Sequence, residues 1–166
     1  MARSTSDTDA RLLLWAGWLC VAAALTAQFA ASLRPLEFLV DSVFSRDDAF
    51  HYFKIARSIA AGHGATFDGI HATSGVQFLW TGFLIPLAWV FDDPVTYLRA
   101  VLFLCIALNL IAAFLFARLC RIAHSDTLAG IALILWAGVL AERWNTLQGM
   151  EYSLHIVILL ETAIVA

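Results

Sequence analysis

The sequence predicts an all-α, polytopic transmembrane helical protein whose outer loop carries short amphipathic and interfacial helices. Hydrophobic residues make up 61% of the chain, charged residues only 14%, and the mean hydropathy is +0.81. This composition is typical of membrane proteins rather than of soluble domains. The first apolar run, residues 12–33, is uncharged over about 22 residues, close to the roughly 20 that a helix needs to cross the hydrocarbon core.

Several apolar runs have the character of membrane spans and no linker divides the chain, so we expect residues 1–166 to form a single transmembrane module. Residues 12–33 form the first span. A cleaved signal peptide is the alternative, although its apolar core would be only about 7–15 residues long. The predicted second and third spans are residues 99–117 and 127–144. The chain stops inside its last apolar run, residues 152–166, which we interpret as a truncated fourth span of a protein that continues.

The positions of the cations predict how the spans are oriented. Lys and Arg in short loops collect on the cytoplasmic side of a membrane. Arg118 and Arg121 follow the second span, and Arg3 and Arg11 precede the first, so we expect both segments inside. The N-terminus is then cytoplasmic and residues 34–98 form an outer loop.

Two short helices are expected in the outer loop. Residues 46–61 have apolar side chains at helical spacing and are followed by Gly62, which predicts an amphipathic helix. Residues 76–91 are apolar but number about 16, contain Pro86 and are followed by two aspartates. The outer loop and Arg118 are expected on opposite sides of the membrane, so the chain must cross it an odd number of times between them. Only one of the two apolar runs in this stretch can therefore be a crossing. We therefore interpret residues 76–91 as an interfacial or re-entrant helix and residues 99–117 as the crossing.

Acidic and imidazole side chains gather at the start of the amphipathic helix. Asp47 and Asp48 are adjacent, and His51 lies four and three residues further along, so these side chains can share a helix face. Such a group can hold a divalent cation, Mg²⁺ or Mn²⁺, or form a hydrogen-bonded carboxylate and imidazole pair. A structural alternative is a variant capping box, with Ser45 as the N-cap and the two acids favoured by the helix dipole.

Two cations and one distant acid complete the candidate site residues. Lys54 and Arg57 follow on the same helix and can hold a phosphate, although cations that snorkel to lipid headgroups occupy similar positions. Glu151 follows Gly149 and Met150 at a predicted membrane boundary. An ionisable group at such a boundary suggests a functional role, and a solvated loop acid is the alternative.

Several of these motifs together resemble one enzyme family. They are Asp-Asp-Ala-Phe-His-Tyr-Phe-Lys-Ile-Ala-Arg at residues 47–57, a stretch with three glycines at 62–69, Thr-Ser-Gly at 73–75 and Gly-Met-Glu at 149–151. They are similar to the N-terminal part of polytopic GT-C glycosyltransferases, above all to bacterial members that use polyprenyl-phosphate sugars. Protein O-mannosyltransferases, aminoarabinose transferases and the catalytic subunits of oligosaccharyltransferases are more distant relatives. Relatives often carry Asn and then His-Pro-Leu-Trp where this chain has Ser74 and then Gln-Phe-Leu-Trp.

The resemblance implies roles for the candidate residues. It places an acidic residue of the first outer loop at the catalytic centre, and the distance from Tyr52 matches this position to Asp48 better than to Asp47. It places a second acid in the next outer loop, which matches Glu151. Asp48 is then the expected base, with Asp47 and Glu151 in support. The residues expected to bind the donor phosphate are His51, Lys54 and Arg57.

The implied function is transfer of a sugar from a polyprenyl-phosphate donor to a glycan, lipid or protein acceptor on the outer face of a bacterial inner (plasma) membrane. The expected partners are the lipid bilayer, the donor and the acceptor. Nucleic acid is excluded because the 10 Lys and Arg residues are scattered. GT-C enzymes run to several hundred residues, so we expect the 166-residue chain alone to be inactive. The alternatives are a non-catalytic membrane scaffold, a truncated remnant of such an enzyme, and part of a transporter.

Overall fold

The structure, a computed structural model, describes residues 2–44, 47–122, 125–142 and 147–166. In these ranges the chain is nearly all helical, which confirms the predicted all-α class, and the strand-like pairing found there is one isolated bridge between Thr66 and Ala72. The elements in chain order are α1 (Ala2–Ser32), α2 (Leu36–Phe38), the π-helical turn η1 (Leu39–Val43), α3 (Asp47–Ala60), α4 (Phe78–Val90), α5 (Pro94–Ile122), α6 (Asp126–Glu142) and α7 (Tyr152–Val165).

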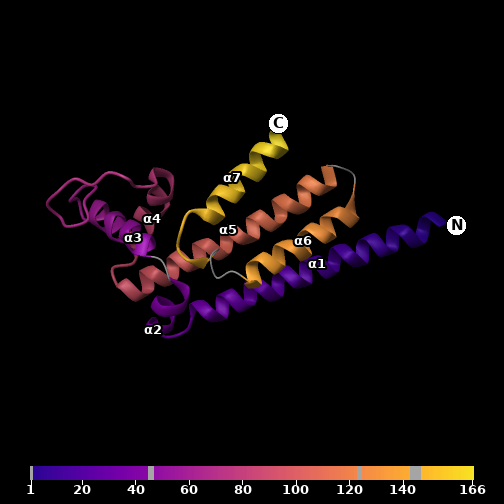
Figure 1. The fold of residues 1–166 in the computed structure, drawn as a ribbon, viewed down its shortest axis with the longest axis horizontal. Helices are drawn as coiled ribbons and strands as arrows, with labels where there is room; N and C mark the ends of the chain where they lie inside the picture. Colours follow the sequence, from indigo (N-terminus) through magenta and orange to yellow (C-terminus); the bar gives the residue numbers. More distant parts are fainter. Residues whose placement is uncertain (1, 45–46, 123–124, 143–146) are drawn as a thin grey trace.

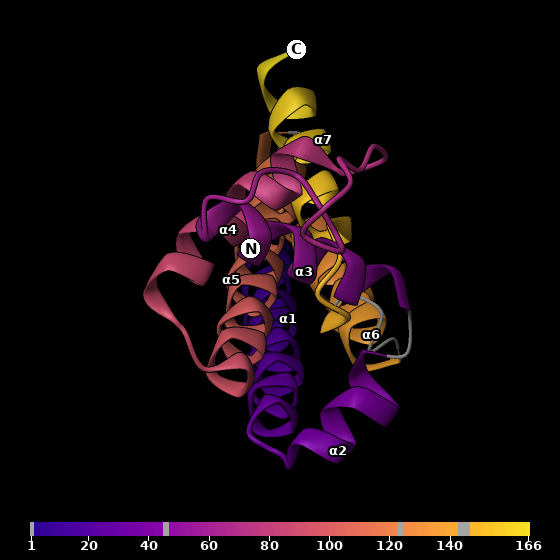
Figure 2. The same cartoon turned by 90° about the vertical axis from the view of Figure 1, so that its left-hand side faces the viewer.

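The helices α1, α5, α6 and α7 form an elongated bundle, and α2, η1, α3 and α4 gather at one end of it (Figures 1 and 2). We call α1, α5, α6 and α7 the four long helices of the bundle. α1 packs mainly against α6, and α5 packs against α1, α6 and α7. α5 begins at the end that carries α3 and α4 and runs to the opposite end, where the chain turns into α6 (Figure 1). α6 then returns, so that α7 begins near α3. The two arginines in the last turns of α5 thus lie at the opposite end of the bundle from α3.

Side-chain caps explain where α5 and α6 begin. Asp93 Oδ2 accepts hydrogen bonds from the backbone N–H and the hydroxyl of Thr96, both at 2.8 Å, and Pro94 occupies the first helical position. These hydrogen bonds lower the pKa of Asp93. α5 therefore starts ahead of the apolar span predicted from hydropathy. Ser125 Oγ caps α6 by accepting a hydrogen bond from the Leu128 N–H at 3.0 Å.

α1 and α6 cross with their backbones nearly in contact, because each carries a glycine at the crossing. A Cβ at Gly17 of α1 would lie 2.8 Å from the Gly130 carbonyl oxygen, and a Cβ at Gly130 of α6 would lie 2.7 Å from the Leu13 carbonyl carbon. Small residues of this kind let helices pack closely in membranes, where van der Waals contact drives association. A larger residue at either position requires the two helices to move apart.

A buried polar network centred on Asn109 joins all four long helices. The Asn109 Nδ2 of α5 donates to Gln28 Oε1 of α1 at 3.2 Å, and Ser153 Oγ of α7 donates to Asn109 Oδ1 at 2.8 Å. The Trp136 indole of α6 donates to the Asn109 carbonyl oxygen at 3.2 Å, and Gln28 Nε2 donates to the Leu140 carbonyl oxygen at 3.2 Å. Buried polar groups are costly unless they are hydrogen-bonded, so this network favours one alignment of the helices.

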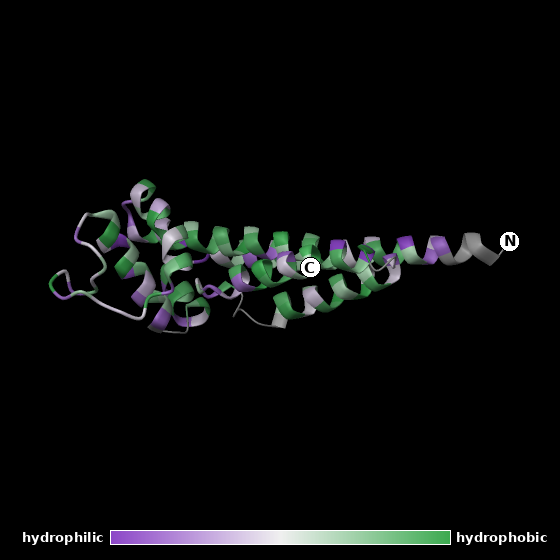
Figure 3. Ribbon diagram, turned by 90° about the horizontal axis from the view of Figure 1, so that it is seen from above, coloured by the Kyte–Doolittle hydropathy of each residue, from purple (hydrophilic) through white to green (hydrophobic). Residues whose placement is uncertain are grey.

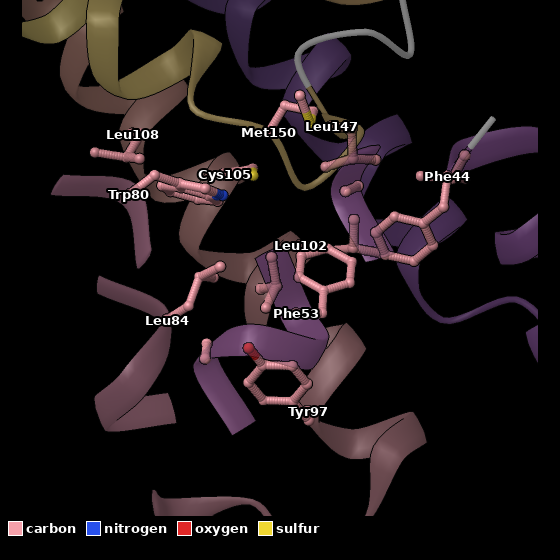
Figure 4. Packing of buried hydrophobic residues seen from close by; sticks show 14 of the residues in the cluster. Phe44, Phe53, Trp80, Leu84, Tyr97, Leu102, Cys105, Leu108, Leu147 and Met150 are labelled. Atoms are coloured by element: carbon pink, nitrogen blue, oxygen red, sulfur yellow. The ribbon is translucent and has the colours of Figure 1, made fainter. Parts of the chain in front are cut away.

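Two apolar clusters fill the interior. One consists mostly of alanine and leucine side chains and lies between the long helices. The other lies at the α3 end, where Phe53 of α3, Trp80 of α4 and Leu102 of α5 meet Leu147 and Met150 from the segment before α7 (Figure 4). This second cluster joins segments from both halves of the chain and supports the candidate site.

Two helices in the described residues, Asp7–Ser32 and Pro94–Ile122, are long and apolar enough to cross a membrane. The first covers the predicted span 12–33 except for its last residue, and the second contains the predicted span 99–117. This finding rests on length and composition, which a buried core helix or a signal sequence can also satisfy. The long helices are mostly apolar along the bundle, and hydrophilic residues gather near the N-terminal end of α1 and around α3 (Figure 3). The shorter apolar helices are Phe78–Val90, Asp126–Ala141 and Tyr152–Val165.

The glycine crossing predicts a difference between two positions of α6. A Cβ at Gly138 would have nothing within 4 Å, whereas one at Gly130 would meet the backbone of α1. We expect Gly130→Ala to destabilise the protein by about 1–3 kcal/mol, the usual cost of overpacking. Gly138→Ala should be neutral or stabilise by up to about 1 kcal/mol, because Ala favours a helix. Unfolding in detergent micelles, followed by circular dichroism, measures both; equal stabilities would contradict the crossing.

Candidate functional site

The start of α3 forms one wall of an open hollow at the end of the bundle. Asp48 is exposed in this hollow, and the imidazole of His51 and the phenol of Tyr52 follow it within about one helical turn. α3 brings these groups together because they occupy its first two turns. The hollow has a volume of about 600 Å³ and is lined by Asp48, Phe50, His51, Tyr52, Phe67 and Gly75.

Glu151 approaches the same place from a distant part of the chain. It is 7% exposed, and its Oε2 atom has no hydrogen-bond partner among the described residues. Burial raises the pKa of the Tyr52 hydroxyl, and the negative charges of Glu151 and Asp48 raise it further because they disfavour the phenolate. A hydrogen bond with the Gln77 side chain acts in the opposite direction. The charges of the two predicted acids therefore both act on one tyrosine.

The turn before α7 positions Glu151. Gly149 has φ +72°, and a Cβ at this position would collide with the ring of Phe53. The Gly149 carbonyl oxygen accepts a hydrogen bond from the buried Trp80 indole at 3.0 Å, and Met150 is buried in the cluster beneath α3 (Figure 4). Glycine is required here for both its backbone conformation and the close approach of the ring. The turn that carries Glu151 is thus packed on both α3 and α4.

The loop after α3 closes one side of the hollow. The Phe67 ring stacks on the imidazole of His51, with centroids 5.1 Å apart and planes at 20°. Asp68 orders this loop, since its two carboxylate oxygens accept from the His71 N–H at 2.8 Å and pair with His71 Nδ1 at 2.7 Å. The pKa of Asp68 is held well below its usual value by these bonds. In the described residues no hydrogen bond joins His51 to Asp48, and the imidazole ring lies against Phe67. A pair of His51 with Asp47 involves a side chain outside the described residues.

Lys54 and Arg57 line a second hollow beside the first. This hollow has a volume of about 480 Å³, and its other walls are apolar or aromatic. Phe50 and Phe67 line both hollows and so form their common boundary. The structure therefore divides the predicted phosphate-binding residues: the two cations share one hollow, and His51 lies in the other.

Arg57 is held in place by the first turn of α5 and by the short segment between α4 and α5. Its Nη2 donates to the Asp92 carbonyl oxygen at 2.7 Å, and its guanidinium lies over the Tyr97 ring, 5.6 Å from the centroid. Nη1 of Arg57 is buried with no hydrogen-bond partner among the described residues, whereas Lys54 is exposed. One cation is thus fixed and the other can move toward a bound anion.

Part of the predicted metal and capping arrangement lies outside the described residues. This applies to Ser45 and to the side chain of Asp47, which were expected to cap α3 or to bind a cation. Within the described ranges no three His, Cys, Asp or Glu side chains gather closely enough to hold a metal ion. The first hollow contains the other two predicted ligands, the carboxylate of Asp48 and the imidazole of His51.

The sequence alone did not predict that Tyr52, Phe67 and Gln77 belong to the candidate site. Tyr52 lies one turn after Asp48 on α3, and this spacing was a signal that both face the same hollow. Phe67 and Gln77 come from the loop that follows α3, and nothing in their local sequence indicates that they reach His51 and Tyr52. Loop residues are placed by tertiary contacts.

No protein family, curated protein or solved structure matches this chain. Its function is therefore inferred from the chemistry of the two hollows. An exposed carboxylate can accept a proton from a hydroxyl, a buried carboxylate can hold a polar ligand group, and paired cations in an apolar setting can bind a phosphate that carries a lipid chain.

The electrostatics of the site predict the titration of Tyr52. Glu151→Gln and Asp48→Asn should each lower the Tyr52 pKa, because each removes a negative charge that opposes formation of the phenolate. Asp41→Asn is the matched control, since Asp41 is exposed in η1 and does not contribute to that pKa. Carbon-13 NMR of ring-labelled tyrosine, with Tyr52→Phe to assign the signal, measures the effect in micelles. An unchanged pKa in both acid variants would show that the two carboxylates do not meet at Tyr52.

Proposed function

We propose that this chain is the N-terminal part of a membrane glycosyltransferase that moves a sugar from a polyprenyl-phosphate donor to an acceptor on the outer face of a bacterial inner membrane. The observation that carries the proposal is the exposed Asp48 carboxylate in a hollow that it shares with His51 and Tyr52, next to a second hollow with two cations and apolar walls. The charge of the buried Glu151 also acts on Tyr52. The same juxtaposition supports the roles implied by the family resemblance. A base and a lipid-phosphate site must lie side by side for such a transfer.

Exposed apolar side chains support a membrane setting. Trp15 of α1 is 68% exposed, Phe78 of α4 is 85% exposed and Leu135 of α6 is 66% exposed, and α5 and α7 also carry exposed large hydrophobic residues. Soluble monomers rarely expose apolar patches larger than a few hundred Å². Lipid contact over these faces would remove the free-energy cost of exposing them to water, and in this proposal α4 lies at the membrane interface.

The second hollow, which is lined by Lys54 and Arg57, suits a lipid-linked phosphate. Arg57 has a buried Nη1 without a hydrogen-bond partner among the described residues, and Lys54 is exposed at the same hollow. Charge-assisted hydrogen bonds from these groups would hold the phosphate oxygens. Pro94 and Leu98 supply apolar walls against which an isoprenoid can pack. The sugar of a donor bound there would extend past Phe50 and Phe67 toward the acidic hollow.

In the proposed reaction the acceptor hydroxyl attacks the anomeric carbon of the donor sugar. A bond forms between the acceptor oxygen and that carbon, and the bond from the carbon to the phosphate oxygen breaks. Asp48 takes the hydroxyl proton, and the polyprenyl phosphate leaves with the bonding electrons toward Lys54 and Arg57. Glu151 would hold a sugar hydroxyl or stabilise positive charge at the anomeric carbon. A divalent cation bound by Asp47, Asp48 and His51 would add charge stabilisation of the departing phosphate.

The role of Asp48 is tested by Asp48→Asn in the full-length natural protein. This change keeps the shape of the side chain and removes its charge, so transfer should fall by about a hundredfold or more if Asp48 is the base. Expression and membrane insertion should stay unchanged, because Asn is tolerated near a helix start. The measurement is transfer of radiolabelled sugar from polyprenyl-phosphate donors in membranes. Asp41→Asn, an exposed acid at the same end, should retain full activity.

Wild-type turnover in Asp48→Asn would refute this assignment. The acid would then have a structural role, and the non-catalytic scaffold would become the better account of the chain. An equal loss in Asp41→Asn would show that activity responds to charge at this end of the protein rather than to the base.

The orientation is tested by cysteine labelling of residues at the two ends of the bundle. The native Cys20, Cys105 and Cys120 are first replaced. A membrane-impermeant maleimide should modify Ile70→Cys in intact cells and Ile122→Cys after permeabilisation, because arginines near the second site keep it cytoplasmic. Modification of both positions from the same side would overturn the proposed topology.

A further inference from the structure

A groove between α1 and α5 lies at the end of the bundle opposite the candidate site. It has a volume of about 710 Å³ and an apolar floor. The Trp18 and Phe114 rings pack against each other in it with centroids 4.7 Å apart, and Phe114 remains 56% exposed. The residues that line the groove are Leu14, Trp18, Phe114, Leu115, Ala117, Arg118, Arg121 and Ile122.

The groove carries a positive charge at its polar end. Arg118 is exposed and has no hydrogen-bond or ion-pair partner in the part of the chain that the structure describes. Arg121 also lines the groove, but its Nε donates to Asp126 Oδ1 at 3.0 Å. The adjoining polar hollow adds Asp7 and Arg11, whose charges offset each other. Arg118 is therefore the uncompensated charge at this end of the groove.

The combination of an apolar floor and an uncompensated arginine indicates the chemistry of the occupant. A small anion such as free phosphate would make no apolar contact with the Trp18 and Phe114 rings. A lipid without net charge would leave the charge of Arg118 unpaired. A phospholipid with net negative charge satisfies both features. Basic pockets between membrane helices on the cytoplasmic side bind anionic headgroups, at about 1 kcal/mol per Lys or Arg near the surface.

We propose that the groove binds an anionic phospholipid of the bilayer, with one acyl chain along Trp18 and Phe114 and its phosphate at Arg118. The site is separate from the two hollows at α3, which lie at the other end of α5. The proposal rests on the part of the proposed function that places α1 and α5 in a membrane, and on none of its chemistry. The lipid would pack between the two helices that the structure finds long enough to span a bilayer.

The test is native mass spectrometry of the full chain in detergent micelles, with phosphatidylglycerol and phosphatidylcholine of identical acyl chains. The wild type should retain phosphatidylglycerol in preference to phosphatidylcholine. Arg118→Gln should weaken phosphatidylglycerol binding about fivefold, which corresponds to about 1 kcal/mol, and should leave phosphatidylcholine unchanged. Arg118→Lys should keep the preference. Arg34→Gln is the matched control, because Arg34 is an exposed arginine beside Phe38 at the other end of the bundle.

Three results would overturn the proposal. One is equal retention of the two lipids by the wild type, and another is an equal loss in Arg34→Gln and Arg118→Gln. The third is displacement of phosphatidylglycerol by excess inorganic phosphate, which would reveal a plain anion site. Phe114→Ser should reduce retention of both lipids, since it removes part of the apolar floor. A chain that inserts into membranes but shows no lipid preference refutes this site alone, whereas failure to insert refutes the proposed function as well.

Discussion

Asn109 lies where the four long helices meet, and its hydrogen bonds determine how those helices are aligned. Its amide and backbone form hydrogen bonds with groups from α1, α6 and α7, in an interior that is otherwise mostly apolar. Sliding one helix past another would leave a buried polar group unsatisfied, at a cost of about 1–3 kcal/mol. Ser153 lies two residues after Glu151, so the bond that aligns α7 also positions the buried acid of the site.

The candidate site depends on a second close contact, between α3 and the turn before α7. Gly149 admits the Phe53 ring and accepts the Trp80 indole hydrogen bond, so the two halves of the chain approach closely at this point. Asp48 lines the hollow from α3, and Glu151, buried in the turn, acts on Tyr52 of that hollow through its charge. The position of the site depends on both the Asn109 network in the bundle and the contact of Gly149 with Phe53 at its end. The first sets the position of α7, and the second docks α3 on it.

The fold separates two kinds of chemistry along the length of the bundle. Acids and two adjoining hollows lie at the α3 end, while arginines and an apolar groove lie at the turn between α5 and α6. Two adjoining hollows, one acidic and one cationic and apolar, suit a substrate that is itself amphiphilic. The groove at the other end has the same combination of apolar floor and cation without a carboxylate that faces it directly. In our proposals the first end performs chemistry on a lipid-linked substrate, and the second binds bilayer lipid.

The sequence by itself determined α3 to α7 and most of α1, because an apolar run or a 3.6-residue period reports burial within one segment. It also placed Asp48, His51, Lys54 and Arg57 on one helix. It did not predict α2, η1 or the N-terminal extension of α1. The tertiary structure alone decided that His51 lies in a different hollow from the two cations, since Phe50 and Phe67, the second from the loop after α3, separate the two hollows. It likewise decided that the charges of Asp48 and of the buried Glu151 act on the same tyrosine, and that Asn109 forms hydrogen bonds with three other helices. Local patterns carry no information on such pairs, because packing geometry rather than spacing brings distant segments together.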